Sequence, residues 1–326
     1  MITVNVSQFG RNGMFVPGNA YIEEWSYAEK EAPTVNKRAF TYKIVEGCAI
    51  KADVHSIDEG AGKPAIVLIH GGCLIMGGRT ENEILVEMLT KAGYTVISID
   101  YRLAPETKLE GILEDLRDAF RWVRKDGEDL LNINPNRMGA MGCSAGGYLT
   151  LMSGFMVDTP PKVLVSFYGY SDVNGAWYSK PDPFYRRQPL VAESIARAAV
   201  GTNPISETVG PHDRHLFYLY CRQNGLWPKE VTGYDPEKEP RKFDRFSPVR
   251  NVTEQYPPTL LLHGDRDTDV PYAQSVAMSK KLGEAGVDHD LITAFGKGHG
   301  FDDVGFRDPA VAVALNRVLV FLKQRM

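Results

Sequence analysis

A single serine stands among small residues in a stretch whose spacing suits nucleophilic chemistry. Ser144 lies in MGCSAGG (141–147), with Gly142 and Gly146 two positions away on either side, which gives the pattern GxSxG. Strand-like residues precede the motif and helix-like residues follow it. A strained turn that presents a reactive serine needs almost no side chain at those two flanking positions. Serine among glycines is also ordinary at a helix N-cap, so the motif alone predicts either a cap or a nucleophile.

A serine hydroxyl is a weak nucleophile at neutral pH, and it needs a histidine base that is itself oriented by a carboxylate. Asp267 lies in HGDRDTDVP (263–271), directly after an apolar run. His299 lies in the glycine-flanked GKGHGF (296–301), after a strand-like run at 289–294. Open α/β sheets place their sites at the carboxyl ends of strands. We therefore expect Ser144, Asp267 and His299 to meet there as a catalytic triad.

Two of these residues have competing interpretations. Asp265 and Asp269 share the turn that contains Asp267, and each of the three aspartates also suits a turn or a cap. His299 is alternatively a solvated loop histidine. The flanking glycines favour His299 as the base, and the family resemblance given below favours Asp267 as the acid.

Negative charge that develops on a substrate carbonyl needs backbone N–H donors. HGGC (70–73) ends an apolar run, and its paired glycines allow bare backbone to approach a substrate. We expect the amides of Gly71 and Gly72, together with that of Ala145 after the serine, to form an oxyanion hole.

Other polar residues near these motifs are interpreted as structural. His70 and His263, each between a strand and a glycine, are predicted to hydrogen-bond loop backbone. The charged residues of DYRLAPE (100–106) are predicted to brace the loops beneath the oxyanion hole. Cys143 invites comparison with a thiol nucleophile, but the centre of GxSxG is the serine, and packing is the favoured role of the cysteine.

Short apolar runs alternate with segments of helical period along most of the chain. The runs are residues 65–70, 94–100, 137–142, 162–169 and 259–264. Residues 85–92 and 112–123 carry apolar stripes at helical spacing, and 42–55 has the pattern of a hairpin that turns at Glu46 and Gly47. This predicts an α/β fold: a mostly parallel sheet with helices on both faces and an antiparallel edge.

The alternation is interrupted once, by a proline- and aromatic-rich stretch. We predict an N-terminal arm at 1–40, a core formed by 41–170 and 257–326, and an inserted cap at 171–256. Within the cap, 192–200 and 215–225 are the expected helices. His212, Asp213 and His215 are too few for a metal site and indicate the start of a helix. The C-terminal helix (308–326) is expected to bury one face, formed by Val311, Val313, Leu315, Val318, Val320 and Leu322.

Composition excludes several classes of protein. The chain has 326 residues and a net charge of −4, without a basic block that could follow a phosphate backbone, so nucleic acid is not expected as a partner. No apolar run approaches the ~18 residues that span a bilayer. The four cysteines are scattered, which argues against a disulfide framework or a zinc site. We expect a cytoplasmic protein that uses no metal or cofactor, and homo-oligomers are compatible with the sequence.

Taken together, these motifs resemble those of the α/β-hydrolase superfamily, and within it those of the hormone-sensitive-lipase-like and related bacterial esterases. HGGC is similar to their HGGG oxyanion motif, DYRLAPE to another stretch typical of the group, and GCSAGG to their nucleophile elbow. HGDRDTDVP is similar to the HGxxDxxVP segment that carries the acid in this and the prolyl-oligopeptidase-like branches. The resemblance covers 42–169 and 256–326. Cys73, in place of the third glycine, is the main departure.

The predicted function is that of a serine carboxylesterase acting on small to medium carboxylic esters through an acyl-enzyme. Cys73, Cys143 and Tyr170 are the residues predicted to contact the substrate. A prolyl-oligopeptidase-like peptidase and a deacetylase of acetylated sugars are the alternatives. A ligand-binding protein without activity is less favoured, because all three residues of the expected triad are present.

Overall fold

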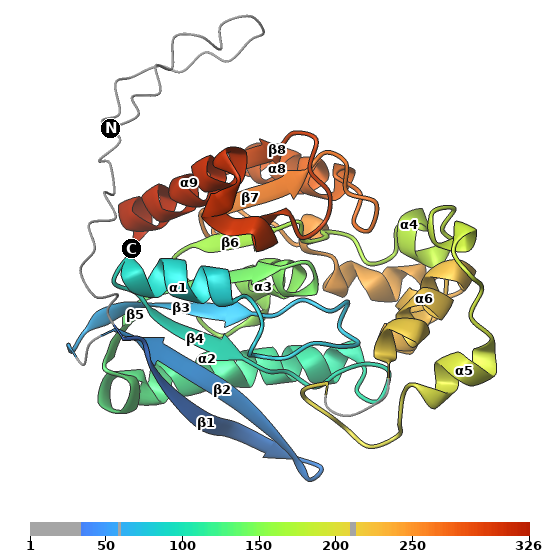
Figure 1. The fold of residues 1–326 in the computed structure, drawn as a ribbon, viewed down its shortest axis with the longest axis horizontal. Coiled ribbons are helices and arrows are strands. Elements are labelled where there is room, and N and C mark those ends of the chain that lie inside the picture. Colours follow the sequence, from blue (N-terminus) through green and yellow to red (C-terminus); the bar gives the residue numbers. More distant parts are fainter. Residues whose placement is uncertain (1–33, 58–59, 209–212) are drawn as a thin grey trace, which may run out of the picture. The chain divides into compact units, whose positions relative to one another are not determined.

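Eight strands form one sheet in the part of the chain that the computed structural model describes, residues 34–57, 60–208 and 213–326 (Figure 1). Their order across the sheet is β1-β2-β4-β3-β5-β6-β7-β8, and from β4 to β8 all neighbours are parallel. The strands are β1 (Asn36–Val45), β2 (Cys48–Ser56), β3 (Lys63–Ile69), β4 (Thr95–Ile99), β5 (Ile133–Cys143), β6 (Leu164–Phe167), β7 (Thr259–Gly264) and β8 (His289–Ala294).

The antiparallel edge of the sheet is the predicted hairpin. β1 and β2 are joined by Glu46 and Gly47, both with positive φ (52° and 76°), as the mirror-image turns that suit twisted hairpins require. β2 then pairs antiparallel with β4. Because β1 begins at Asn36, the sheet starts within the segment predicted as an arm. The rest of that segment, 1–33, lies outside the described residues.

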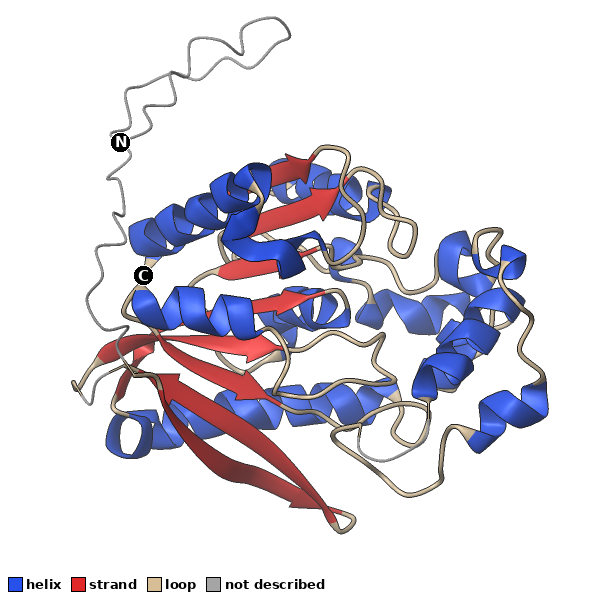
Figure 2. Cartoon of the chain, in the orientation of Figure 1, coloured by secondary structure: helices blue, strands red, loops and turns tan. Residues whose placement is uncertain are grey.

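Helices cover both faces of the sheet (Figure 2). Alternate residues of β3 divide between two hydrophobic clusters: Ile66 joins the cluster of α1 and α9, and Val67 that of α2, α3 and α8. These helices are α1 (Glu83–Lys91), α2 (Leu109–Leu131), α3 (Ala145–Met156), α8 (Ala273–Glu284) and α9 (Pro309–Arg325). The predicted mostly parallel sheet between two helical layers is therefore confirmed.

The buried face of α9 differs from the prediction. Val313 and Val320 are 62 % and 54 % exposed, so their assignment to the buried face was wrong. Val313 lies two residues, about 200° of helix, beyond Val311, which places it on the opposite side. The helix buries residues at the i, i+3, i+4 and i+7 spacing instead: Val311, Ala314, Leu315, Val318, Phe321 and Leu322.

The segment between β6 and β7 consists of short helices beyond the carboxyl ends of the parallel strands, on the right of Figure 1. They are α4 (Ala176–Ser179), η2 (Tyr185–Arg187), α5 (Glu193–Ala198), α6 (Arg214–Asn224), α7 (Trp227–Thr232), η3 (Pro240–Phe246) and η4 (Pro248–Arg250). The two predicted helices correspond to α5 and α6. Trp227 and Phe217 belong to the same hydrophobic cluster as the sheet, and the boundaries of a separate cap stay a prediction.

The start of α6 agrees with the prediction made for it. The side chain of Asp213 accepts a hydrogen bond from the His215 amide (3.0 Å) and so caps the helix. His212 lies outside the described residues. Elsewhere in the described chain, no three histidine, cysteine, aspartate or glutamate side chains are placed to hold a metal ion.

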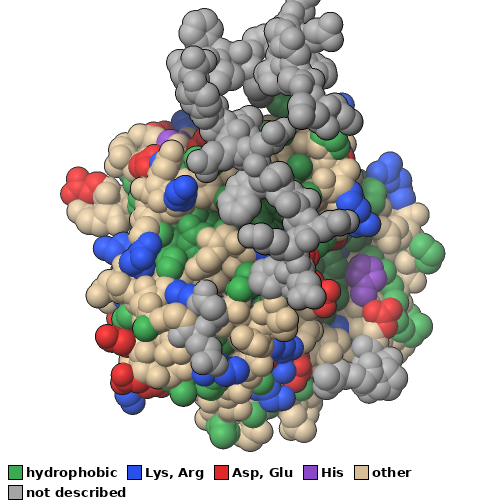
Figure 3. Space-filling view, turned by 60° about the vertical axis from the view of Figure 1, so that its left-hand side comes forward, with side chains coloured by type: hydrophobic (Ala, Val, Ile, Leu, Met, Phe, Trp, Pro, Cys, Tyr) green, Lys and Arg blue, Asp and Glu red, His purple; other side chains and the backbone are tan. Residues whose placement is uncertain are grey.

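Two surface properties bear on possible partners. On the face drawn in Figure 3, the visible basic and acidic side chains are interspersed and form no continuous basic stripe. Among the residues that the structure describes, no helix is both long enough and apolar enough to cross a bilayer.

The packing of α9 gives a matched test of the fold. Leu315→Ala removes a fully buried side chain and should lower the free energy of unfolding by about 2–5 kcal/mol, whereas Val313→Ala should change it by less than about 0.5 kcal/mol. Urea unfolding measures both. Equal losses for the two variants would contradict this orientation of α9.

Candidate active site

Ser144 occupies the turn between β5 and α3 in a backbone conformation rare for a residue with a side chain. Its φ is 55° and its ψ is −118°, a strained combination that costs about 1–3 kcal/mol. Its amide donates to the Phe167 carbonyl (2.9 Å), which ties the turn to the end of β6. The Ser144 side chain makes no capping hydrogen bond to α3. The helix-cap alternative is therefore wrong, and the strained turn predicted from GxSxG is present.

The two glycines of the motif allow the chain to fold over itself. A Cβ on Gly142 would lie 2.4 Å from the backbone of Gly146, and a Cβ on Gly146 would lie 2.0 Å from the Ile69 carbonyl oxygen. Both distances are far below van der Waals contact. The bare backbone thus lets the turn cross against the end of β3, where the HGGC loop begins.

His299 and Asp267 are in direct contact. His299, in the turn after β8, donates from Nδ1 to Oδ2 of Asp267 over 2.7 Å. The other carboxylate oxygen of Asp267 accepts the amides of Asp269 (2.8 Å) and Val270 (2.9 Å), and Nε2 of His263 lies 3.2 Å from Oδ2. Asp267, after β7, is thus the aspartate of its turn that orients the histidine through Nδ1.

The alternative aspartate Asp265 serves its turn in another way. Its carboxylate accepts the amide of Gly296 (2.6 Å), which links the turn after β7 to the turn after β8. The contacts of His263 and His70 agree with the predicted structural roles. The ring of His263 lies 3.0 Å from the Val270 carbonyl, and the ring of His70 lies 3.0 Å from the Gly71 carbonyl.

The surroundings of Asp267 and His299 favour the ionised form of both side chains. Burial opposes the negative charge of Asp267, but hydrogen bonds from His263 and His299 outweigh it and hold the pKa of the carboxyl well below its usual range. Burial also opposes the charged form of His299. The hydrogen bond to Asp267 and the charge of Asp269 outweigh that effect, so the pKa of His299 is raised. An imidazolium is therefore stabilised at this position.

Ser144 and His299 both contact the end of β6 and share no hydrogen bond. Tyr168 follows Phe167, the hydrogen-bond partner of Ser144, and its ring centroid is 4.5 Å from that of His299. Among the described residues, none shares a hydrogen bond with the Ser144 hydroxyl. Serine–histidine hydrogen bonds are often long before a substrate binds. The serine and the histidine thus flank the same end of β6.

The HGGC loop runs alongside the serine. A Cβ on Gly71 would lie 3.5 Å from that of Ser144. Gly72 has a φ of 86°, and a Cβ there would lie 2.0 Å from the Met76 carbonyl oxygen, so glycine is required. The amides of Gly71, Gly72 and Ala145 donate to no other part of the described chain. Free N–H groups in such a loop are suited to an oxygen anion.

The DYRLAPE segment braces this loop, as predicted. Tyr101 stacks on the ring of His70 (centroids 4.2 Å apart), and its hydroxyl donates to the carbonyls of His70 (3.1 Å) and Gly71 (2.9 Å). Glu106 pairs with both terminal nitrogens of Arg214 (2.8 and 2.7 Å), and Arg214 also donates to the carbonyl of Ile75. Two more ion pairs hold the segment itself: Asp100–Arg79 and Arg102–Asp115.

The three predicted substrate contacts are all buried. Cys73 adopts a left-handed φ of 59°, and its carbonyl accepts Nε1 of Trp227 (3.0 Å). The Cys143 thiol lies 3.5 Å from Oδ2 of Asp302, in agreement with a packing role. Tyr170 is fully buried and stacks on Tyr148 of α3. Their contact with substrate stays a prediction.

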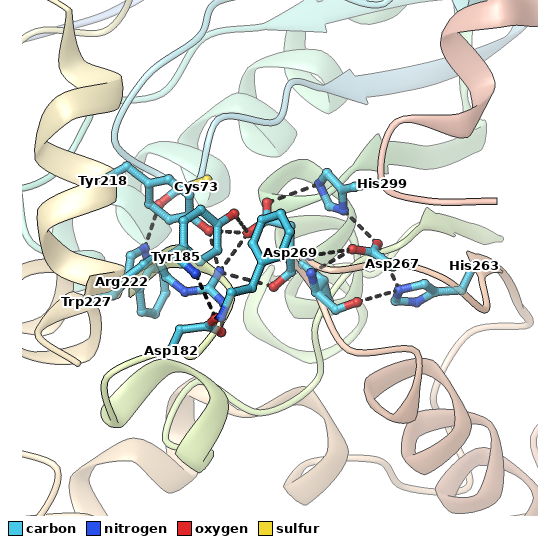
Figure 4. A network of polar contacts seen from close by, with 12 residues as sticks. Cys73, Asp182, Tyr185, Tyr218, Arg222, Trp227, His263, Asp267, Asp269 and His299 are labelled. Carbon is cyan, nitrogen blue, oxygen red and sulfur yellow. Dashed lines mark hydrogen bonds and ion pairs between the residues drawn. The ribbon is translucent and has the colours of Figure 1, made fainter. Parts of the chain in front are cut away.

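Sequence reasoning missed a polar cluster on the other side of His299 (Figure 4). One carboxylate oxygen of Asp269 accepts hydrogen bonds from Tyr185 (2.7 Å), Tyr218 and Arg222 (2.6 Å), and Arg222 is 1 % exposed. Only the spacing of Tyr218 and Arg222, four residues apart on one helix face, was visible in the sequence. Their approach to Asp269 depends on the fold of the whole segment between β6 and β7.

Comparison with known proteins places this geometry in a family. The BD-FAE family model matches residues 53–282. The chain belongs to the BD-FAE family. The match extends from β2 to α8 and so includes the serine turn, the HGGC loop and Asp267, whereas His299 lies beyond its end.

Curated relatives of this BD-FAE protein are of two kinds. The non-reducing polyketide synthase Preu6 of Preussia isomera is 26 % identical over 295 residues, which are 80 % of this chain and 13 % of the synthase. Esterase LipC of Mycobacterium tuberculosis is 26 % identical over 347 residues, covering 97 % of this chain and 75 % of that protein. The chain thus spans about an eighth of the length of the synthases.

Solved structures share its fold. An alpha/beta hydrolase superfamily protein from Enterococcus faecalis has a TM-score of 0.67 and 25 % identity, covering 89 % of this chain and 99 % of that one. EstE1, a thermophilic carboxylesterase cloned from a metagenomic library, has a TM-score of 0.63 and 21 % identity, with 92 % of each chain covered. The predicted α/β-hydrolase fold and family resemblance are confirmed.

The charge balance at the Asp267–His299 pair gives a direct test. The pKa of His299 should lie above the ordinary value of a histidine, and Asp267→Asn should lower it, because the variant removes the anion that stabilises the imidazolium. NMR titration of the imidazole signals, with His299→Gln used for assignment and Asp265→Asn as control, measures this. A His299 pKa below that ordinary value in the unaltered protein would contradict the charge balance described.

Proposed function

We propose that the protein is a serine carboxylesterase with Ser144 as nucleophile, His299 as base and Asp267 as the orienting acid. The observation that carries the proposal is the 2.7 Å hydrogen bond from His299 Nδ1 to a buried Asp267, beside a strained serine turn. That bond leaves Nε2 of His299 as the nitrogen free to exchange a proton. The esterase-like structural neighbours and LipC support the same conclusion.

In the proposed reaction, the Ser144 oxygen attacks the ester carbonyl while Nε2 of His299 takes the hydroxyl proton. The carbonyl oxygen becomes an anion that accepts hydrogen bonds from the amides of Gly71, Gly72 and Ala145. When the intermediate collapses, His299 gives the proton to the departing alkoxide, and the acyl group stays on the serine. Water, deprotonated by the same nitrogen, then releases the acid. The reaction uses no metal or organic cofactor.

Backbone donors suit this role because they need no reorganisation when charge develops. Removal of one oxyanion donor from a hydrolase costs about 10²–10³ in rate. Here the donors lie in a loop held by Tyr101, Arg214 and Trp227, so their positions are fixed before a substrate arrives. Small to medium esters stay the predicted substrates, and a cytoplasmic location stays a prediction.

Peptides and acetylated sugars are two other classes of substrate that the first assays should include. A peptidase would need to cleave amide bonds, whose leaving amine is harder to expel than an alcohol. Acetylated sugars are suggested by two proteins of similar structure, a truncated carbohydrate esterase from gut microbiota and an acetyl ester-xyloside bifunctional hydrolase from Caldicellulosiruptor lactoaceticus. Both are less than 25 % identical to this chain, so the likeness extends to the fold alone.

Removal of the nucleophile should abolish turnover. Ser144→Ala should lower kcat for p-nitrophenyl acetate by at least about 10³-fold, because no acyl-enzyme can form. Ser153→Ala serves as the matched control, because it removes a buried hydroxyl from α3, the helix that follows Ser144. A fluorophosphonate should label the unaltered protein but not Ser144→Ala. Substantial activity in Ser144→Ala would refute the proposed nucleophile.

A matched pair of substrates separates the esterase from the peptidase. The same acylated amino acid is presented as an ester and as an anilide. An esterase should turn over the ester and should cleave the anilide no faster than Ser144→Ala does. Anilide cleavage that is lost in Ser144→Ala would favour the peptidase, with the same serine carrying the reaction.

A further inference from the structure

Asp269 is placed where the proposed mechanism has no role for it. Its Oδ2 lies 3.6 Å from Nε2 of His299, the nitrogen that exchanges protons with the serine and with the departing alcohol (Figure 4). Nδ1 of the same ring is bound to Asp267. The histidine thus lies between two carboxylates, one on each nitrogen, and only the first is explained by the triad.

The carboxylate of Asp269 is held through one oxygen only. Tyr185, Tyr218 and Arg222 all donate to Oδ1, and each of the three is at most 6 % exposed. Oδ2 accepts no hydrogen bond from the described part of the chain. The Asp269 side chain is 16 % exposed and that of His299 is 25 % exposed, so solvent reaches this position. Three buried donors therefore fix a carboxylate whose second oxygen stays free beside the base.

A purely structural role accounts for half of this arrangement. Arg222 is a buried cation, and a buried cation needs anionic partners. Asp182 (2.7 Å) and Oδ1 of Asp269 (2.6 Å) provide them. That role fixes Oδ1 only. The charge of Asp269 also favours the His299 imidazolium, but neither effect supplies a hydrogen-bond donor to Oδ2. The free oxygen points to an interaction with a bound molecule.

We propose that Asp269 determines specificity for the leaving alcohol: its Oδ2 accepts a hydrogen bond from a hydroxyl on the second carbon of the alcohol, counted from the ester oxygen, and it disfavours alcohols in which that second carbon is a carboxylate. This role rests on the proposed function. The departing oxygen must come within about 2.6–3.2 Å of Nε2 to receive its proton. A hydroxyl on the second carbon is then within reach of an acceptor that lies 3.6 Å from the same nitrogen.

The positive charge of Arg222 beside Asp269 determines which kind of hydrogen-bond donor on the alcohol suits Oδ2. The Arg222 guanidinium, bonded to the other carboxylate oxygen, offsets the negative charge of the group. A neutral hydroxyl is therefore a better match than a cation. An alcohol with a carboxylate in the same place brings two anionic oxygens together in a partly buried site, and such pairs repel.

Three acetate esters test the proposal on the unaltered protein. The monoacetate of ethylene glycol carries the hydroxyl, 2-methoxyethyl acetate replaces its proton by a methyl group, and O-acetylglycolate carries a carboxylate. We expect kcat/KM to be about tenfold higher for the hydroxyl ester than for the methoxy ester, mainly through KM, and lowest for acetylglycolate. Equal values for the first two esters would overturn the proposal without any variant.

Asp269→Asn replaces the unbonded acceptor oxygen, Oδ2, by a hydrogen-bond donor. The three donors hold the amide oxygen, so the amide NH₂ takes the place of Oδ2. This group donates equally well to a hydroxyl and to a methoxy oxygen. The tenfold ratio should therefore fall to about one, and acetylglycolate should gain relative to both. Asp265→Asn, which removes the same charge from the same turn, should keep the ratio of the unaltered protein. An unchanged ratio in Asp269→Asn would overturn the proposal.

Failure of this proposal is distinguishable from failure of the proposed function. The unaltered protein is assayed with p-nitrophenyl acetate, whose leaving group has no neighbouring hydroxyl. Absence of turnover would refute the esterase itself, whereas turnover combined with equal rates on the hydroxyl and methoxy esters would refute only the role of Asp269. If Asp269→Asn does not fold, as circular dichroism would show, the three-ester comparison on the unaltered protein still decides.

Discussion

The site depends on one close backbone crossing, where the serine turn passes the end of β3. Gly146 lies so near the carbonyls of Ile69 and His70 that no side chain fits between them. This approach brings Gly71 against Ser144 and sets the free amides of the HGGC loop beside the serine. The strain of the Ser144 backbone persists because its surroundings are rigid: the first ten residues of α3, from Ala145 to Gly154, are buried. The packing of α3 thus maintains a conformation that the serine would not adopt alone.

The segment between β6 and β7 completes the site as well as covering it. Arg214 and Trp227 come from this segment and hold the HGGC loop from the outside, through the carbonyls of Ile75 and Cys73. Arg214 and Glu106 form a buried ion pair, and loss of either partner would leave an unpaired charge in the interior. Tyr170 packs between Tyr148 of α3 and Trp227, so one aromatic cluster joins the serine helix to the segment. Changes in this segment are therefore expected to alter the positions of the amides proposed to bind the oxyanion, as well as any substrate contact.

Much of this arrangement could be predicted because it is encoded locally. Strand runs, turn glycines and the aspartate after β7 each depend on residues close in sequence, and the rule that sites lie at the carboxyl ends of strands brought distant motifs together. Two features could not be obtained in that way. The buried face of α9 depends on which valines contact the sheet, and an almost continuous apolar helix such as VAVALNRVLVFL leaves that open. The contact between Asp269 and Arg222 joins residues 47 positions apart through short helices whose packing has no sequence motif.

In the proposed mechanism, the two carboxylates beside His299 have two opposite effects on proton transfer. A raised histidine pKa lowers the fraction of neutral base at a given pH, which slows the first proton transfer. The same charges stabilise the imidazolium that forms once the serine proton has moved, and this lowers the energy of the transition state. Asp267 exerts its effect through Nδ1, away from the reacting atoms, whereas Asp269 faces the nitrogen that must deliver a proton to the leaving group. A neutral hydroxyl on the alcohol that binds Oδ2 would separate Asp269 from Nε2 and free that proton for transfer. In this proposal, Asp269 both selects the alcohol and, before a matching alcohol binds, stabilises the proton on Nε2 of His299.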